Sequence, residues 1–308
     1  MTDERREIVR REPAPDGLLL LDKERGPTSA DIVRKVSRML PRKTRIGHAG
    51  TLDPDATGLL VLMIGGATKL SNVIMDLPKR YDAVFRFGVE TDTYDTTGTV
   101  VRERDVGGLT EQQIRAVLPE FTGRILQTPP RYSAVKVKGR RAYELARRGE
   151  EPPLQPRETM VYKLDLISFS PPEARFFVVC GKGMYLRGLA HDIGQRLGVG
   201  ACTAELRRLG IGSLEPTIST RDLTPENWRE QIRDGSIIFR DQPVFRLKSR
   251  GALSLRRGLP IRADDFLERP REPVGLRTGV LDETGKLIAV AVIGYGGALL
   301  ERRILLPL

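Results

Sequence analysis

Apolar and polar positions alternate along this chain with two different periods, which indicates a fold that mixes strands and helices. Residues 18–21 form a short apolar run that predicts a buried strand. Between Thr28 and Pro41 the apolar positions recur at helical spacing, and a Thr or Ser at the start can cap the predicted helix. Residues 81–87 alternate in the manner of a half-buried strand. These elements place the chain in the α+β class.

The remaining segments extend this mixture and suggest how the chain is divided. Helices are predicted over residues 68–77, 110–118, 186–197 and 224–229, and strands on either side of the Pro171-Pro172 pair. From about Arg246 the pattern changes to short apolar runs separated by glycine turns, which is typical of a small β-rich module. The expected division is a disordered charged tail over residues 1–15, a main domain over 16–245 and the module over 246–308.

A glycine-containing polar loop over residues 45–60 precedes a second apolar run. Glycine lets the backbone turn and lets a ligand approach the main chain closely, and Asp53 before Pro54 is held in an extended or turn conformation. The loop therefore presents the Asp53 carboxylate and the His48 imidazole at the edge of a buried strand or helix. An Asp before a Pro is by itself more often a turn former, and the loop does not match the nucleotide-binding glycine motifs.

Composition indicates a soluble globular protein with an acidic partner. The 308 residues are 40% hydrophobic and 30% charged, which is typical of a folded chain and excludes a disordered one. The formal charge is +11 and the isoelectric point is about 9.9. Nucleic acid is the first candidate, because Lys and Arg neutralise phosphates. A basic surface that is simply well solvated is the alternative.

Cysteine and histidine are too sparse for the usual zinc sites. The chain has two of each, Cys180 and Cys202, and His48 and His191. So few cysteines favour a reducing compartment, and we expect a cytoplasmic protein. No apolar run reaches 18 residues, so no membrane helix is expected, and the charged start of the chain does not resemble a signal peptide.

Four motifs in this order resemble the TruB-type tRNA pseudouridine synthases over roughly residues 17–212. The first is Gly47-His48-Ala49-Gly50-Thr51-Leu52-Asp53-Pro54, followed by Ala56-Thr57-Gly58 and Gly66-Ala67-Thr68-Lys69. The others are a Y-S-A-x-K motif over residues 132–136, a K-G-x-Y-[IL]-R motif over residues 182–187, and Leu206-Arg207-Arg208-Leu209. The resemblance implies a mixed, largely antiparallel sheet flanked by helices, and a PUA-like RNA-binding module at residues 246–308.

The resemblance also implies roles for individual residues. Asp53 falls on the catalytic aspartate, and Arg187 on the arginine that pairs with it, an arrangement that would hold the carboxylate in position. Tyr81 falls on the tyrosine that stacks on the flipped base. The expected substrate-binding residues are His48, Tyr81, Tyr185 and Leu206, with His48 as a flat wedge in the folded RNA. Asp55 is a second acid near Asp53, and we expect it to point to solvent.

Basic residues near these motifs are the expected RNA contacts. They are Arg42, Lys43, Arg131, Lys136, Lys138, Arg140 and Arg141. Several are interleaved with Tyr132 and Tyr143, and charge with aromatic rings suits a nucleic-acid surface. The alternative for such residues is a solvated helix face or helix end.

The implied reaction converts uridine to pseudouridine at position 55 in the T loop of tRNA, with no cofactor and no metal. The base must leave its stack to reach Asp53. The carboxylate could attack the sugar C1′, attack the base at C6, or remove a 2′ proton, and the sequence leaves these routes open. The expected partner is the T arm of tRNA. No membrane contact and no obligatory protein partner are expected, and the chain should act as a monomer.

Two other functions share some of these features. A dyskerin-type synthase has the same core motifs but is guided by a separate RNA, works with protein partners and usually has a longer basic C-terminus. Activity on a bare transcript would separate the two. A tRNA-folding chaperone would need binding without chemistry, and intact Asp53, Tyr81 and Arg187 argue against an enzyme that has lost its reaction.

Overall fold

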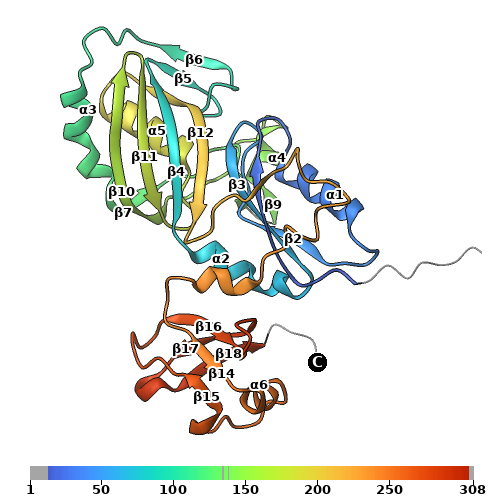
Figure 1. The fold of residues 1–308 in the computed structure, drawn as a ribbon. Coiled ribbons are helices and arrows are strands. Elements are labelled where there is room, and N and C mark those ends of the chain that lie inside the picture. The colour runs from blue at the N-terminus through green and yellow to red at the C-terminus, as the bar shows by residue number, and fades with distance from the viewer. Residues whose placement is uncertain (1–12, 134, 138, 305–308) are drawn as a thin grey trace, which may run out of the picture.

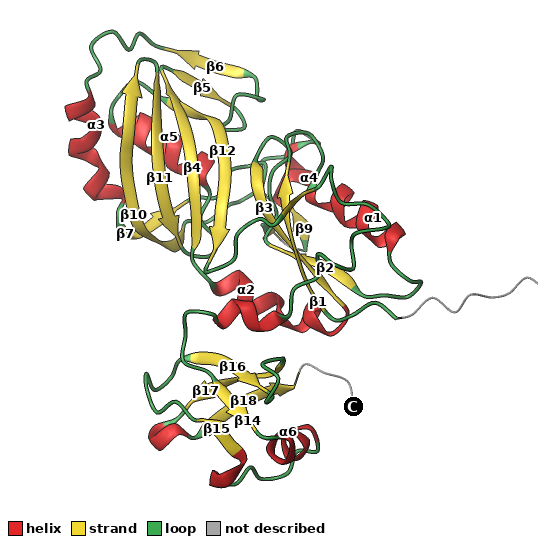
Figure 2. Cartoon of the chain, viewed as in Figure 1, coloured by secondary structure: helices red, strands yellow, loops and turns green. Residues whose placement is uncertain are grey.

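The computed structural model describes residues 13–133, 135–137 and 139–304, and these ranges form the fold shown in Figure 1. The predicted charged tail lies outside the described residues as far as residue 12. Figure 2 shows two lobes built on one long sheet, with a smaller sheet beneath them. Within the described ranges, no helix is both long and apolar enough to cross a membrane.

Nine strands form the long sheet. Eight follow the order β13-β1-β3-β12-β4-β11-β10-β7, and β2 pairs with the second half of β3. The pairings β1–β13 and β3–β12 are parallel and the other pairings of this sheet are antiparallel, which confirms the predicted mixed, largely antiparallel sheet. The strands are β1 (Gly17–Lys23), β2 (Ile46–Ala49), β3 (Thr57–Ile64), β4 (Lys79–Phe87), β7 (Gly123–Gln127), β10 (Arg157–Ser170), β11 (Glu173–Cys180), β12 (Ala201–Ile211) and β13 (Ile218–Ser219).

The two most apolar strands, β1 and β3, are buried on both faces. In β3, Leu59, Val61 and Met63 pack into one hydrophobic cluster, while the alternate residues face another. Side chains of a strand point alternately to opposite faces, so a strand buried on both faces reads as an unbroken apolar run. This is why residues 59–64 carry no polar alternation.

Helices flank the long sheet, and one more packs on the C-terminal sheet. Those of the main domain are α1 (Ser29–Met39), α2 (Ser71–Asp76), α3 (Glu111–Val117), α4 (Ala142–Ala146) and α5 (Leu186–Arg196), and α6 (Ser249–Arg256) packs on the C-terminal sheet. Apolar residues of α3 and α5 pack on β4, β10 and β11 in one cluster, and α1 packs on β1 and β3 in another. The predicted capping of α1 is confirmed, because the Thr28 hydroxyl accepts from the Asp31 amide in a capping box.

Two hairpins extend from this framework. One joins β5 (Val89–Thr91) to β6 (Val100–Glu103), and the other joins β8 (Lys136–Val137) to β9 (Arg140–Arg141). The segment between β5 and β6 returns to the sheet, since the Thr203 amide of β12 donates to the carbonyl of Tyr94 at 2.9 Å. The segment between β5 and β6 therefore contacts β12 in the middle of the long sheet.

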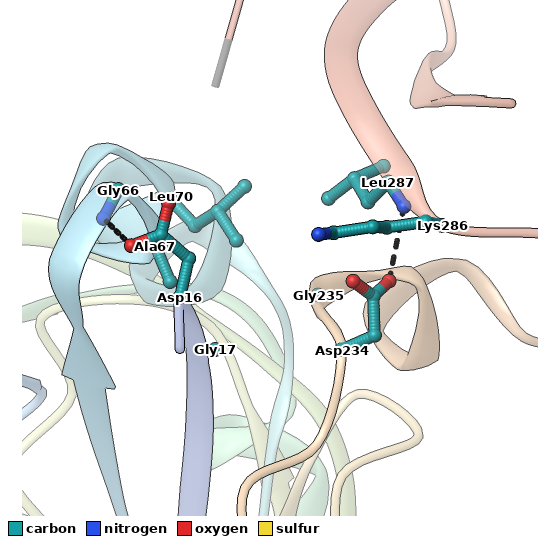
Figure 3. A pocket seen from close by; sticks show the side chains of 9 residues that line it. All are labelled: Asp16, Gly17, Gly66, Ala67, Leu70, Asp234, Gly235, Lys286 and Leu287. Carbon is teal, nitrogen blue, oxygen red and sulfur yellow. Dashed lines mark hydrogen bonds between the residues drawn. The ribbon is translucent and has the colours of Figure 1, made fainter. Parts of the chain in front are cut away.

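The C-terminal residues form the predicted β-rich module. Its sheet has the order β15-β14-β16-β17-β18, with β14 (Phe245–Leu247), β15 (Phe266–Glu268), β16 (Arg277–Leu281), β17 (Leu287–Ile293) and β18 (Leu299–Ile304). Phe239, Leu281 and Leu287 belong to the same hydrophobic cluster as Leu18 and Leu70. The smaller sheet therefore packs on the main domain through shared apolar contacts. Figure 3 shows a small hollow at this junction, with Asp16 on one side and Lys286 on the other.

Two predicted helices differ in the structure. The helix predicted over residues 68–77 is a 3₁₀ segment, Gly65–Leu70, followed by the short α2, and the element begins directly after β3, earlier than predicted. Residues 224–229 form successive turns, not a helix. After the first turn, each backbone amide of residues 230–232 bonds to the carbonyl three residues earlier, not four as in an α-helix. Arg233 then pairs with Leu18 of β1. Trp228 is nonetheless buried.

Candidate active site

The loop that follows β2, residues 50–56, carries the predicted aspartate and is held by its main chain. Lys23 at the end of β1 is fully buried, and its ammonium donates to the carbonyls of Pro54 at 2.8 Å and Ala56 at 2.7 Å. Burial lowers the pKa of Lys23. A buried ammonium needs such acceptors, so Lys23 and the loop fix one another. No sequence pattern predicts this role, because any residue supplies a carbonyl.

The other half of the loop is anchored from α1 and β12. The Ser29 hydroxyl donates to the Leu52 carbonyl at 3.1 Å and accepts from the Leu52 amide at 3.0 Å. The Arg208 guanidinium, 2% exposed, donates to the carbonyls of Gly50 at 3.0 Å and Leu59 at 2.8 Å. Carbonyls at alternate positions 50, 52, 54 and 56 are therefore bound by buried side chains, which fix the path of the loop.

A close contact between β3 and β12 sets the distance between the two lobes at the site. Gly58 has φ +95°, and a Cβ built there would lie 2.2 Å from the Arg208 carbonyl oxygen. Glycine is therefore required both by its backbone conformation and by the neighbouring strand. Gly58 pairs with Arg208 in the parallel register of these strands, so the loop ends where the two lobes meet.

Asp53 and Arg187 meet across this junction. The Arg187 Nε lies 2.9 Å from the Asp53 Oδ2, and the two come from the β2–β3 loop and the first turn of α5. The Arg187 side chain is 8% exposed while that of Asp53 is 44% exposed. The Arg187 guanidinium is therefore the buried partner of the pair, and the Asp53 carboxylate is accessible to a ligand. A charge-assisted bond of this geometry holds the carboxylate in one orientation.

Arg187 is held by three further groups. It donates to the carbonyls of Thr93 at 2.8 Å and Tyr132 at 3.0 Å, and its Nη1 lies 3.3 Å from the Asp95 Oδ2. Asp95 was not among the predicted site residues, although the polar stretch over residues 91–98 was visible in the sequence. Two carboxylates and two carbonyls therefore surround one guanidinium.

Tyr81 lies on β4 directly across from Arg208 of β12. It is 9% exposed, and burial raises the pKa of its phenol, while the Arg208 guanidinium beside it opposes that rise. Asp53 also contributes to the raised pKa, so its charge acts on this phenol. The phenol of Tyr81 is therefore uncharged near neutral pH.

Tyr185 lies at the N-terminus of α5 and is clamped by Gln127, the last residue of β7. The Gln127 amide accepts from the Tyr185 N–H at 2.9 Å and donates to the Tyr185 carbonyl at 3.1 Å. Burial raises the pKa of the Tyr185 phenol, and the Ser133 hydroxyl opposes that rise. Asp53 and Arg187 both act on this phenol electrostatically, which brings Tyr185 into the same site.

His48 and Leu206 lie on β2 and β12. The Nδ1 of His48 is buried without a hydrogen-bond partner among the described residues, and burial, Arg208 and Arg141 lower the pKa of this imidazole. Leu206 is half-buried and packs against the hydrophobic clusters of both lobes, so it lies at the junction with the Asp53 loop.

The predicted RNA contacts are distributed over two segments. Arg42 and Lys43 are exposed on the connection from α1 to β2, and Arg140 and Arg141 are exposed on β9. Arg131 is also exposed but forms an ion pair with Glu151. The predicted contact Lys138 and the side chain of Lys136 lie outside the described part of the chain.

Asp55 and the two cysteines complete the candidate residues. Asp55 is exposed, as predicted for an acid that points to solvent. Cys180 and Cys202 are free and buried, and burial raises their pKa to about 12 and about 11. Neither thiol is an activated nucleophile. Among the described residues, no three His, Cys, Asp or Glu side chains come together in a group that could hold a metal ion.

Comparisons with known proteins match this site to one family. The model of the TruB family pseudouridylate synthase N-terminal domain matches residues 37–186, and that of the tRNA pseudouridylate synthase B C-terminal domain matches residues 187–247. A tRNA pseudouridine synthase B of Aquifex aeolicus is 46% identical over 76% of this chain and 83% of its own length. One of Stutzerimonas stutzeri is 37% identical over 94% of this chain and 95% of its own length.

Solved structures agree on the fold. A chain in the crystal structure of a Cbf5-Nop10-Gar1 complex superposes with a TM-score of 0.71 at 24% identity, covering 94% of this chain and 85% of that one. A chain in the structure of an H/ACA RNP bound to a substrate RNA containing 2'-deoxyuridine also gives 0.71, at 22% identity, with the same coverage of both chains. Through the matched domains, the relatives and the motif loop that carries Asp53, the chain belongs to the TruB family of pseudouridylate synthases.

Proposed function

We propose that this protein isomerises uridine to pseudouridine at position 55 in the T loop of tRNA. The observation that carries the proposal is the half-exposed Asp53 carboxylate, fixed 2.9 Å from the nearly buried Arg187 on a loop whose carbonyls are bound by buried side chains. Relatives that share 37–46% identity bear the name tRNA pseudouridine synthase B. The family and this geometry support the same reaction.

The reaction exchanges one bond of the nucleoside for another. The bond from N1 to C1′ breaks, the uracil turns over, and C5 bonds to C1′; C5 releases its proton and N1 gains one. Asp53 is proposed as the group that reacts with the nucleoside, and Arg187 as the residue that orients it. The isomerisation is redox-neutral, so no oxidant or reductant is needed.

The flipped base is proposed to lie between the aromatic and apolar residues that surround Asp53. Tyr81 would stack on one face, while Tyr185 and Leu206 would line the pocket. His48 would fill the place that the base leaves in the RNA loop, because its imidazole is flat and half-buried beside Arg208. Unstacking a base is compensated by stacking and hydrogen bonds in the enzyme.

The wider RNA contact is proposed to run over the exposed basic residues. Arg42, Lys43, Arg140 and Arg141 would neutralise backbone phosphates, together with Arg131, Lys136 and Lys138. Residues 246–308 are proposed as a PUA-like module that extends this surface, next to a catalytic domain over residues 16–245. We also propose that the protein is a cytoplasmic monomer that needs no obligatory protein partner.

Tritium release from a T-arm RNA that carries 5-tritiated uridine tests the reaction, with purified protein and no guide RNA. The wild type should release tritium. Asp53→Asn keeps the size of the side chain but removes its negative charge, and we expect a loss of at least about 10³-fold in kcat. Asp55→Asn is the matched control, because that acid is exposed, and it should keep full activity.

The other outcomes identify the alternatives. Tight RNA binding without release by the wild type would favour an RNA-guided synthase or a folding chaperone. Adding guide RNA and partner proteins would then separate those two. Release by both the wild type and Asp53→Asn would remove Asp53 from the centre of the reaction.

A further inference from the structure

The segment that links β5 to β6 contains a tyrosine in an unusual backbone conformation. Tyr94 has φ +63°, in the left-handed region that bulky residues rarely adopt. Its carbonyl accepts from the Thr203 amide at 2.9 Å, and its own amide donates to the Thr91 carbonyl at 3.3 Å. A conformation of this kind persists only where the surroundings determine it, and such residues cluster at functional sites.

The neighbours of Tyr94 both reach Arg187. The Thr93 carbonyl accepts from the Arg187 Nη1 at 2.8 Å, and the Asp95 Oδ2 lies 3.3 Å from the same nitrogen. The other oxygen of Asp95 accepts from the Thr93 hydroxyl at 2.7 Å. The left-handed turn at residue 94 therefore directs residues 93 and 95 to one side, where they hold the guanidinium that orients Asp53.

The Tyr94 ring contacts the same helix one turn further along. It stacks on the His191 imidazole with 4.1 Å between ring centroids and 14° between planes. His191 follows Arg187 by four residues on α5, so both side chains leave the helix on the same face. The 93–95 segment thus docks on α5 at two successive turns, through Arg187 and through His191.

We propose that Tyr94 and His191 form a positioning pair for the isomerisation, whose stack holds the Thr93–Asp95 segment in register with Arg187 and so fixes the orientation of Asp53. The inference rests on the proposed function of the site. Neither ring contacts Asp53 in the described structure, so both residues act through Arg187. Their loss should lower the rate of the chemical step and leave RNA binding almost unchanged.

Four single variants test this pair with the tritium-release assay. Tyr94→Phe keeps the stack and should keep wild-type kcat. Tyr94→Ala and His191→Ala remove the stack from opposite sides, and each should lower kcat at least about tenfold with KM changed less than about twofold, as misplaced catalytic groups do. Ile167→Ala is the matched control, because this side chain is 57% exposed on β10.

A glycine variant separates positioning from simple destabilisation. Tyr94→Gly removes the ring and also relieves the left-handed strain, so its melting temperature should exceed that of Tyr94→Ala. If the stack positions Arg187, kcat of Tyr94→Gly stays as low as that of Tyr94→Ala. If kcat recovers together with the melting temperature, the effect was one of stability and the inference is wrong.

A double-mutant cycle tests the route through Asp95. In an Asp95→Asn background, Tyr94→Ala should lower kcat by less than about threefold, because coupled residues give non-additive effects. Fully additive losses would overturn the inference. So would wild-type activity in both Tyr94→Ala and His191→Ala, whereas an inactive wild type would contradict the proposed function itself. If Tyr94→Ala does not fold, His191→Ala gives the same readout without altering the strained residue.

Discussion

Arg187 joins two carboxylates and two carbonyls with a single nearly buried guanidinium. The planar fork of an arginine can reach partners in several directions, while a lysine ammonium is a point charge on a flexible stem. Arg187→Lys should therefore keep the charge and lose the geometry, and we expect kcat to fall about 10²-fold with the fold retained. Single-turnover tritium release measures the rate, and a loss below threefold would show that charge alone suffices.

Asp192 gives the site region a pH-dependent stability. Burial raises the pKa of its carboxyl from 3.8 to about 6, and the Gln127 amide beside it opposes the rise. Because the folded pKa exceeds the unfolded one, the native state binds more protons between about pH 4 and 6. The stabilisation from the protonated carboxyl is complete below pH 4 and is lost as the pH rises through 6.

Asp192→Asn keeps a neutral side chain at all pH values. The variant should be more stable than the wild type above pH 6, by about 1–2 kcal/mol after discounting for partial exposure, and equally stable near pH 4. Melting temperatures from pH 4 to pH 8 measure the difference. A difference that is the same at every pH would rule out the titration of Asp192 as its source.

At the scale of elements, the contact between β3 and β12 leaves no space for a side chain. Gly58→Ala would place a Cβ 2.2 Å from the Arg208 carbonyl, while Gly123→Ala, at nearly the same φ of +90°, meets nothing within 4 Å. Gly123→Ala should cost about 1 kcal/mol of backbone strain. Gly58→Ala should cost several kcal/mol, by the added overlap, and should lose activity because the Asp53 loop ends there.

Thermal unfolding and tritium release of the two variants measure this pair. Equal losses of stability would mean that the backbone conformation alone matters at residue 58. If the contact with the Arg208 carbonyl matters, Gly58→Ala must lose more stability than Gly123→Ala.

The sequence predicted those parts of the site that depend on side-chain identity. Asp53 and Arg187 were found through motifs, and the structure brings the two together. Lys23, Ser29 and Arg208 escaped prediction as anchors, because their partners are backbone carbonyls that leave no pattern in the sequence. The prediction of a helix around Trp228 was wrong, because a long-range contact determines the structure there. The pairing of Arg233 with Leu18 takes the chain back to β1 before a helix can continue.

At the scale of the whole molecule, the C-terminal sheet and the catalytic sheet share one hydrophobic cluster. Leu287 is 3% exposed and, like Leu70, lies close to Gly235 at the junction (Figure 3). Trp228, the only tryptophan, packs in the main domain beside α1. Its fluorescence therefore reports unfolding of a cluster that, among the described side chains, includes none from the C-terminal sheet.

Leu287→Ala should lower the stability reported by Trp228, by about 2–5 kcal/mol, as buried leucine truncations do. The reason is that the two parts should unfold cooperatively through their shared cluster. Leu267→Ala is the control, because this residue of β15 is 50% exposed. A Trp228 transition that does not move in Leu287→Ala would show that the two parts unfold independently.

The anchoring of the Asp53 loop through its carbonyls has a consequence for how the loop tolerates mutation. Carbonyls of residues 50, 52, 54 and 56 are bound by Arg208, Ser29 and Lys23, and every amino acid carries a carbonyl. Thr51 and Asp55 have exposed side chains, so other residues at these two positions should leave the conformation of the loop unchanged. A library randomised at these two positions should retain folded, active members in most of its sequences, whereas the three distant anchors should tolerate almost none.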